Sequence, residues 1–149
     1  MDLVHVPLKK NRAYDTMTSI FSASFGSNSI KNNVTATIDK NAVITAPAFV
    51  MSGLFPGYYT ITMICMDAPF AHYIKCNVYS NGKSGSVVLN YQGPPPEIVE
   101  RRNYVITCWR QPARISPPPR APVSRARFSI ENFVARYALL EIKSIHFRV

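Results

Sequence analysis

Cysteine and histidine are the side chains in this sequence whose types and spacing could support chemistry. Cys65 lies a short segment before His72, and such a pair could act as a thiol nucleophile and its base. No third residue that would orient the base accompanies them, and buried cysteines are usually inert. The Cys and His residues also lack the paired spacing of metal ligands. We therefore expect a protein that is not an enzyme, with no catalytic residue, metal site or cofactor.

The cysteines and the N-terminal segment indicate the compartment. The three cysteines Cys65, Cys76 and Cys108 all fall within expected strands, and buried free thiols are typical of a reducing environment. Near the N-terminus the lysines follow a short apolar run, which is the reverse of the order in a secretory signal. No stretch is apolar for long enough to span a membrane. We expect a cytoplasmic protein without a transmembrane segment.

The net charge of +9 is concentrated in the last third of the chain. Residues 1–100 carry seven Lys/Arg against six Asp/Glu, whereas residues 101–149 carry ten against two. A basic region of this kind attracts nucleic acid, acidic protein or a membrane surface. No helix-turn-helix, zinc finger or aromatic RNA-binding signature accompanies it, so nucleic-acid binding is not the favoured interpretation. A solvated face with a basic loop explains the charge more simply.

Patterning predicts a mainly β domain with one helix. Aromatic and β-branched residues are frequent, and residues 58–65 form an apolar run expected of a central strand covered on both faces. An irregular N-terminal arm is expected over residues 1–32, with a short helix near residues 14–21, and the domain over 33–149. Further strands are expected over these ranges: 34–38, 42–45, 72–79, 86–91, 103–110 and 141–149.

The last third combines a loop and the predicted helix. Residues 112–127 are rich in Pro, Arg and Ser, which predicts an extended connector that does not pair inside a sheet. Residues 129–139 predict a helix, because Ser129 can cap it and apolar residues recur on one face. That apolar stripe is expected to pack on the core and not to be a partner surface.

Short motifs follow one another in a characteristic order over about residues 34–147. They are Pro47 to Gly53-Leu54, Tyr59-Thr60 to Asp67-Ala68-Pro69, His72 to Asn77, Tyr91 to Pro95-Pro96, Tyr104 to Gln111, and Phe128, Phe133 and Tyr137. In this order they resemble the phosphatidylethanolamine-binding protein (PEBP) family, which includes Raf kinase inhibitor-like proteins. The resemblance implies an antiparallel β-sandwich with Greek-key connections and one C-terminal α-helix.

The resemblance also implies a small pocket that accepts phosphate-like groups or a phospholipid headgroup. Glycine lets backbone N–H groups approach an anion, proline sets the loop shape, and histidine donates hydrogen bonds. Asp67 is expected to hold its loop through backbone N–H groups more than to touch the ligand. The ligand-binding residues carried over from the family pattern are Asp67, Ala68, Pro69, Phe70, His72, Gly93, Pro95, Pro96 and Arg102.

Several positions depart from the family pattern. Cys65 stands where the family has an aspartate, Met66 where it has a proline, and Arg102 where it has a second pocket histidine. Arg102 could replace that histidine with a forked cationic donor, or it could point to solvent beside Arg101. The sequence leaves these two interpretations open.

Two functions follow from the resemblance and its departures. The first is a binding protein with an anion-accepting pocket that modulates a protein partner such as a kinase. The alternative is a structural or assembly protein, in a viral or virion setting, that retains the scaffold with a degenerate pocket. Oligomerisation is compatible with both functions.

Overall fold

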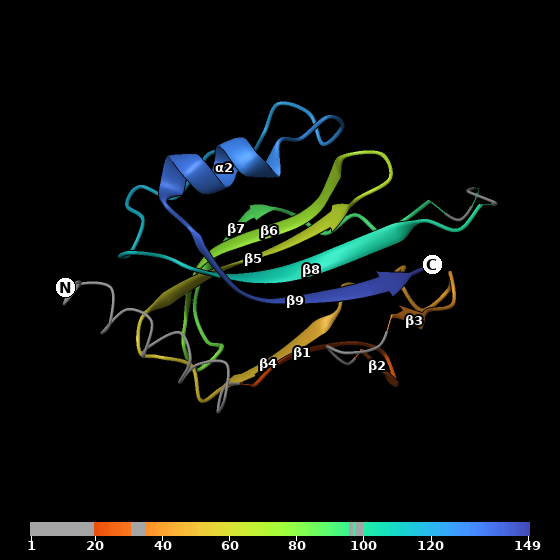
Figure 1. Cartoon of the computed structure of the whole chain (residues 1–149), viewed down its shortest axis with the longest axis horizontal. Helices are drawn as coiled ribbons and strands as arrows, with labels where there is room; N and C mark the ends of the chain where they lie inside the picture. The colour runs from red at the N-terminus through yellow and green to blue at the C-terminus, as the bar shows by residue number, and fades with distance from the viewer. Residues whose placement is uncertain (1–19, 31–34, 96, 98–99) are drawn as a thin grey trace, which may run out of the picture.

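The computed structural model describes residues 20–30, 35–95, 97 and 100–149, which form two β-sheets stacked face to face with one helix outside them (Figure 1). The smaller sheet has the strand order β2-β1-β4, and the larger sheet β3-β9-β8-β5-β6-β7. The elements are β1 Ile20–Phe25, β2 Asn28–Ile30, β3 Ala36–Thr37, β4 Ala48–Ser52, β5 Tyr58–Cys65, β6 Phe70–Tyr79, β7 Ser86–Leu89, β8 Asn103–Arg110, α2 Ile130–Tyr137 and β9 Leu140–Arg148.

The larger sheet contains a Greek key. Strands β5, β6 and β7 are consecutive antiparallel neighbours, and β8 returns across the sheet to pair with β5 on its other side. The resulting spatial order β8-β5-β6-β7 is that of a Greek key. All pairs in both sheets are antiparallel except β3 with β9. The predicted mainly β sandwich with a C-terminal helix is confirmed.

Strand β5 is the centre of the molecule. Its alternate residues Tyr59, Ile61 and Met63 point between the two sheets, where they pack against aromatic side chains from β1 and β9. Thr60 and Thr62 occupy its other face and are also buried. The Thr60 hydroxyl donates to Gln111 Oε1 at 2.8 Å, and Thr62 Oγ1 accepts from the indole N–H of Trp109 at 2.9 Å. Coverage of both faces explains its near-continuous apolar sequence.

The prediction of an irregular arm is wrong for residues 20–30. These residues form β1 and β2, and Phe21, Phe25 and Ile30 are buried between the sheets. Residues 21, 23 and 25 alternate with polar residues, a period of two that the Ser-rich composition obscured. Residues 20–21 are therefore not helical, and residues 1–19 lie outside the described part of the chain.

The prediction of a strand over residues 42–45 is also wrong. This segment is a turn in which the Ala42 N–H donates to Asp39 O at 3.0 Å. Val43 is fully buried without pairing in a sheet, because it fills the core from the turn. The expected strands over 34–38 and 86–91 are shorter than predicted, as β3 and β7.

Buried polar groups attach the Pro/Arg-rich loop over residues 112–127 to the larger sheet. Near its start, the Ile115 N–H donates to Asn77 Oδ1 at 2.8 Å, and the Asn77 side-chain amide donates to Ile115 O at 2.8 Å. At its end, the Arg125 guanidinium donates to the carbonyl oxygens of Ala71, His72 and Asn90. The loop is therefore held at both ends, although it contains no strand.

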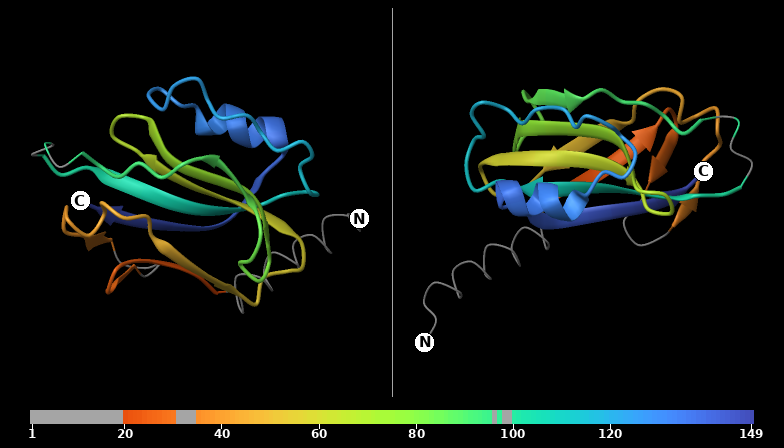
Figure 2. Two further views of the ribbon diagram at one scale, coloured as in Figure 1. Left: turned by 180° about the vertical axis from the view of Figure 1, so that it is seen from behind. Right: turned by 90° about the horizontal axis from the view of Figure 1, so that it is seen from above.

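Helix α2 lies on the outer face of the larger sheet (Figure 1 and Figure 2). Ser129 Oγ caps it by accepting from the Asn132 N–H at 3.1 Å, and the helix ends at Ala138, whose φ of 52° is left-handed. No residue of α2 is fully buried, and Ile130 and Phe133 are half-buried against an apolar cluster on the sheet. The prediction that the apolar stripe is core packing therefore holds only in part. Neither α2 nor any other helix among the described residues is long and apolar enough to cross a membrane.

Candidate functional site

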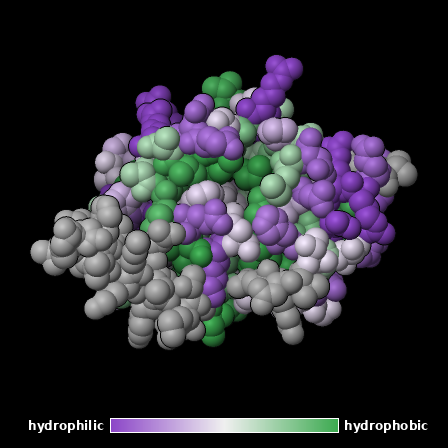
Figure 3. Space-filling view, viewed as in Figure 1, coloured by the Kyte–Doolittle hydropathy of each residue, from purple (hydrophilic) through white to green (hydrophobic). Residues whose placement is uncertain are grey.

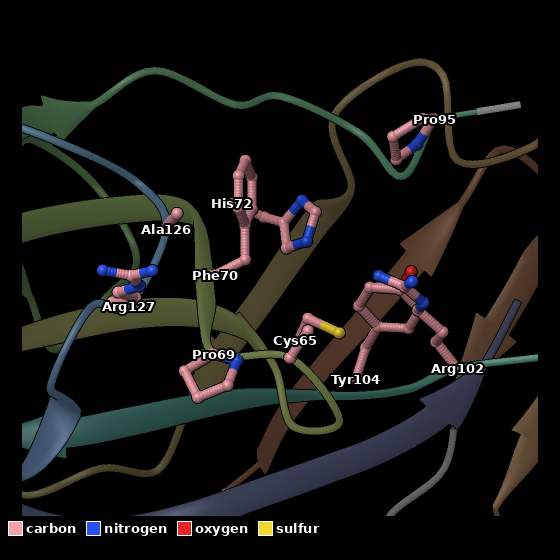
Figure 4. Close-up of a pocket in the computed structure, with 10 residues that line it drawn as sticks. Cys65, Pro69, Phe70, His72, Pro95, Arg102, Tyr104, Ala126 and Arg127 are labelled. Atoms are coloured by element: carbon pink, nitrogen blue, oxygen red, sulfur yellow. The ribbon is translucent and has the colours of Figure 1, made fainter. Parts of the chain in front are cut away.

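A cavity of 310 Å³ opens at one end of the larger sheet, where the turn after β5, the start of β6 and the loop before β8 meet (Figure 4). Six of the residues expected to bind ligand line it: Ala68, Pro69, Phe70, His72, Pro95 and Arg102. They come from two segments far apart in the sequence. The fold brings these segments side by side, as expected.

Two hydrogen bonds join the segments. The Gln92 N–H donates to His72 O at 2.9 Å, and His72 Nδ1 lies 2.6 Å from Gln92 O. A carbonyl oxygen only accepts, so Nδ1 carries the proton of this bond. The opposite ring nitrogen, Nε2, is then the proton acceptor of a neutral imidazole.

The imidazole of His72 is buried at the inner wall of the cavity. Its ring lies between Phe70, at a centroid distance of 4.7 Å, and Tyr104, at 5.4 Å, and points over Cys65 (Figure 4). Burial lowers the pKa of His72, the bond to Gln92 raises it, and the nearby Arg125 charge lowers it further. The net lowering favours a neutral ring near neutral pH.

Arg102 lies at the rim of the cavity. Its side chain is 30% exposed and its Nη2 is 3.2 Å from Glu100 Oε1, in an ion pair on the outer side. Arg102 and Tyr104 both line the cavity (Figure 4). Of the two interpretations left open by the sequence, the structure therefore favours Arg102 as a cavity residue.

Two of the expected ligand residues, Asp67 and Gly93, do not line the cavity. Asp67 Oδ2 accepts from the Asn103 N–H at 2.7 Å, which lowers the pKa of Asp67 and holds the turn against β8. Gly93 packs so closely that a Cβ there would lie 2.4 Å from Val43 O. Both residues therefore shape the loops. Pro96 lies outside the described residues.

Comparison with solved structures identifies the architecture. A carboxypeptidase Y inhibitor, solved in complex with its cognate proteinase, superposes with a TM-score of 0.70 at 15% identity over 97% of this chain and 91% of its own. A phosphatidylethanolamine-binding protein from Plasmodium vivax gives 0.64 at 14% identity over 87% and 84%. A putative homologue from Chlamydia trachomatis gives 0.59 at 11% identity over 87% and 96%. The chain has the PEBP fold. No protein-family model matches its sequence.

The PEBP fold of this chain adds three lining residues that the sequence did not indicate, Tyr104, Ala126 and Arg127, and places Cys65, which departs from the family pattern, on the same wall. Tyr104 lies on β8, two residues after Arg102, which directly precedes the strand, so an extended chain with alternating side chains could have placed both at one cavity. Burial raises the pKa of Tyr104 to about 12, so its ring is neutral. No local sequence pattern indicated Arg127, because its position depends on a tertiary contact: its N–H donates to Pro69 O at 2.7 Å, in the turn before β6.

Cys65 and His72 line the same cavity in this PEBP fold. In a catalytic thiol–imidazole pair, a carboxylate would orient the imidazole through Nδ1. Here Nδ1 of His72 is bonded to the Gln92 carbonyl instead. Among the described residues, no cluster of His, Cys, Asp or Glu could hold a metal ion. The arrangement provides an acceptor nitrogen, a rim guanidinium and apolar walls, which suits binding.

Proposed function

We propose that this chain is a non-enzymatic PEBP-like binding protein whose cavity accepts a phosphate-like group and that ligand occupancy modulates a protein partner. The observation that carries the proposal is the placement of His72 Nε2 and Arg102 on one cavity formed by the two predicted segments. The ligand chemistry is that of a phosphate monoester, whether it belongs to a phospholipid headgroup or to a free metabolite.

The charges and hydrogen-bonding groups support this ligand class. The Arg102 guanidinium can offer two parallel N–H donors to phosphate oxygens, and Arg127 adds a second cation to the lining. Neutral His72 can accept a hydrogen bond through Nε2 from the P–OH of a phosphate monoanion, and protonated His72 can donate one to a phosphate oxygen. The apolar walls formed by Pro69, Phe70 and Pro95 exclude water and strengthen both contacts.

Thermal unfolding with added phosphate, phosphoethanolamine or phosphotyrosine tests the proposal. A ligand at about a hundred times its Kd stabilises the native state by about 2.7 kcal/mol, which raises the Tm by several degrees. Arg102→Gln should abolish this shift, whereas Arg101→Gln, which removes an exposed charge one residue away, should retain it. The absence of a shift at millimolar ligand, or an equal loss in both variants, would contradict the proposal. Comparison of the Tm shifts with the three ligands shows whether the cavity prefers a phospholipid headgroup or free phosphate.

A structural or assembly role is the second candidate function. The position of Cys65 on the cavity wall supports it, because a thiol there replaces the aspartate expected from the family pattern and weakens polar contact with a ligand. An assembly protein should self-associate. Light scattering over a range of concentrations tests this role, and a strict monomer would contradict it.

A further inference from the structure

A second hollow lies between α2 and the end of the Pro/Arg-rich loop. It has a volume of 360 Å³, and three arginines, Arg120, Arg127 and Arg136, line it together with aromatic residues of the helix region. We name this hollow the basic groove. Figure 3 shows hydrophobic atoms reaching the surface between hydrophilic side chains in this upper part of the molecule.

None of the three arginines of the basic groove forms an ion pair within the described residues, where the ion pair found joins Arg102 to Glu100 at the first cavity. The carboxylate of Glu131 lies beside the groove and accepts from Ser129 Oγ at 3.4 Å, so three cations stand against one anion. The Arg136 guanidinium lies over the ring of Tyr137 at 5.6 Å, a contact that leaves its charge in place. Three cations around one small hollow create a potential that attracts carboxylates.

The floor of the basic groove is aromatic. The rings of Phe128 and Phe133 are 5.7 Å apart and tilted by 54°, and those of Phe133 and Tyr137 are 5.1 Å apart and tilted by 58°. All three side chains are only half-buried, although the sequence pattern placed the helix stripe in the core. The floor can therefore accept one further apolar side chain.

Both walls of the basic groove are held in place before any ligand arrives. Arg125 attaches the loop to three backbone carbonyls, and the Arg127 N–H is bonded to Pro69 O at 2.7 Å. Ser129 caps the helix on the other side. A preformed site loses little conformational entropy on binding, so a short ligand can bind with useful affinity.

We propose that the basic groove binds an acidic peptide segment of a protein partner, in which carboxylates flank one apolar side chain. Single-stranded nucleic acid suits the groove less well, because it needs a basic track over several phosphates and exposed ring faces for stacking. Here the hollow is small, at 360 Å³, and the rings are tilted against one another. A regulatory role for this peptide binding rests on the proposed function. The binding itself requires no ligand in the first cavity.

Fluorescence anisotropy with the full chain and a labelled peptide of glutamates around a central leucine tests the inference. The double variant Arg120→Gln/Arg136→Gln should weaken binding about tenfold, because each exposed charge contact contributes up to about 0.7 kcal/mol. The control variant Arg101→Gln/Arg114→Gln removes the same net charge from exposed positions outside the groove and should bind normally. All four positions are exposed, so the fold should be retained.

Three results would overturn the inference. They are no peptide binding at low salt, an equal loss of affinity in the groove and control variants, and tighter groove-dependent binding of a single-stranded DNA oligonucleotide than of the peptide. A peptide with glutamines in place of the glutamates should not bind. None of the mutated residues lines the first cavity, so failure here is distinguishable from failure of the phosphate proposal.

Discussion

His72 combines a buried ring, one hydrogen-bonded nitrogen and one nitrogen facing a cavity. The Gln92 carbonyl holds Nδ1, and Phe70 and Tyr104 hold the ring plane. Such a residue serves both stability and binding, because its protonation is opposed by burial and would be favoured by a bound anion.

The lowered pKa of His72 predicts a loss of stability in mild acid. Below the ordinary histidine pKa of about 6.5, the unfolded chain takes up a proton that the folded ring resists, so the free energy of unfolding falls as the pH falls. His72→Gln retains an N–H for the Gln92 carbonyl but cannot be protonated. Thermal melts between about pH 7 and about pH 5 should therefore show a smaller decrease in Tm for this variant than for the wild type.

The other histidines are present in both proteins and so cancel in this comparison. An identical pH dependence of Tm in the wild type and in His72→Gln would show that His72 does not titrate with folding.

At the scale of elements, the Pro/Arg-rich loop depends on buried hydrogen bonds more than on apolar contacts. Gln111 is buried and joins β5, β6 and the loop through Thr60, Asn77 and Ala113. A buried amide with several partners is costly to remove, because each partner loses a bond that water cannot replace.

Gln111→Ala should lower the free energy of unfolding by about 2–4 kcal/mol, since it leaves the Thr60 hydroxyl and the Asn77 N–H without their acceptor. Urea unfolding measures this change. Gln92→Ala is the matched control, because its side chain is exposed and its backbone carbonyl still binds His72. A change below about 1 kcal/mol in Gln111→Ala would mean that the loop is held by other contacts.

At the scale of the whole molecule, the two hollows adjoin the same arginine. Arg127 lines both the cavity and the basic groove, at the point where the loop meets β6. An anion in one hollow reduces the attraction that Arg127 exerts in the other, so the two sites are linked, and linkage is reciprocal.

Phosphate in the cavity should therefore weaken binding of the acidic peptide in the groove by about fivefold. Anisotropy titrations at constant ionic strength, with chloride replacing phosphate, measure the effect without a change in screening. Arg102→Gln should remove the effect by preventing phosphate binding while leaving the groove intact. An unchanged peptide Kd in the presence of bound phosphate would show that the sites are independent.

The backbone pattern of this protein was largely determined by local sequence. Strands β5 and β8 match their predicted ranges, and β6, β9 and α2 were each placed within about two residues, because periodicity and capping act over short distances. Strand β1 was missed because the serines between Phe21, Ala23 and Phe25 obscured its period of two. The turn at Val43 was misread because an apolar side chain can fill a core without being in a strand.

The shape of the cavity, in contrast, depends on contacts between segments that are distant in the sequence. Sequence resemblance indicated most of its wall, but the roles of Asp67 and Gly93 in shaping loops depend on Asn103 and Val43, which lie far from them in the chain. The half-exposed aromatic stripe of α2 and the shared position of Arg127 likewise follow from how the loop docks on β6. Sequence by itself determined the strands and the types of residue available for binding. Only the tertiary structure decided which side chains face a hollow, because that depends on contacts between distant segments whose geometry no local pattern records.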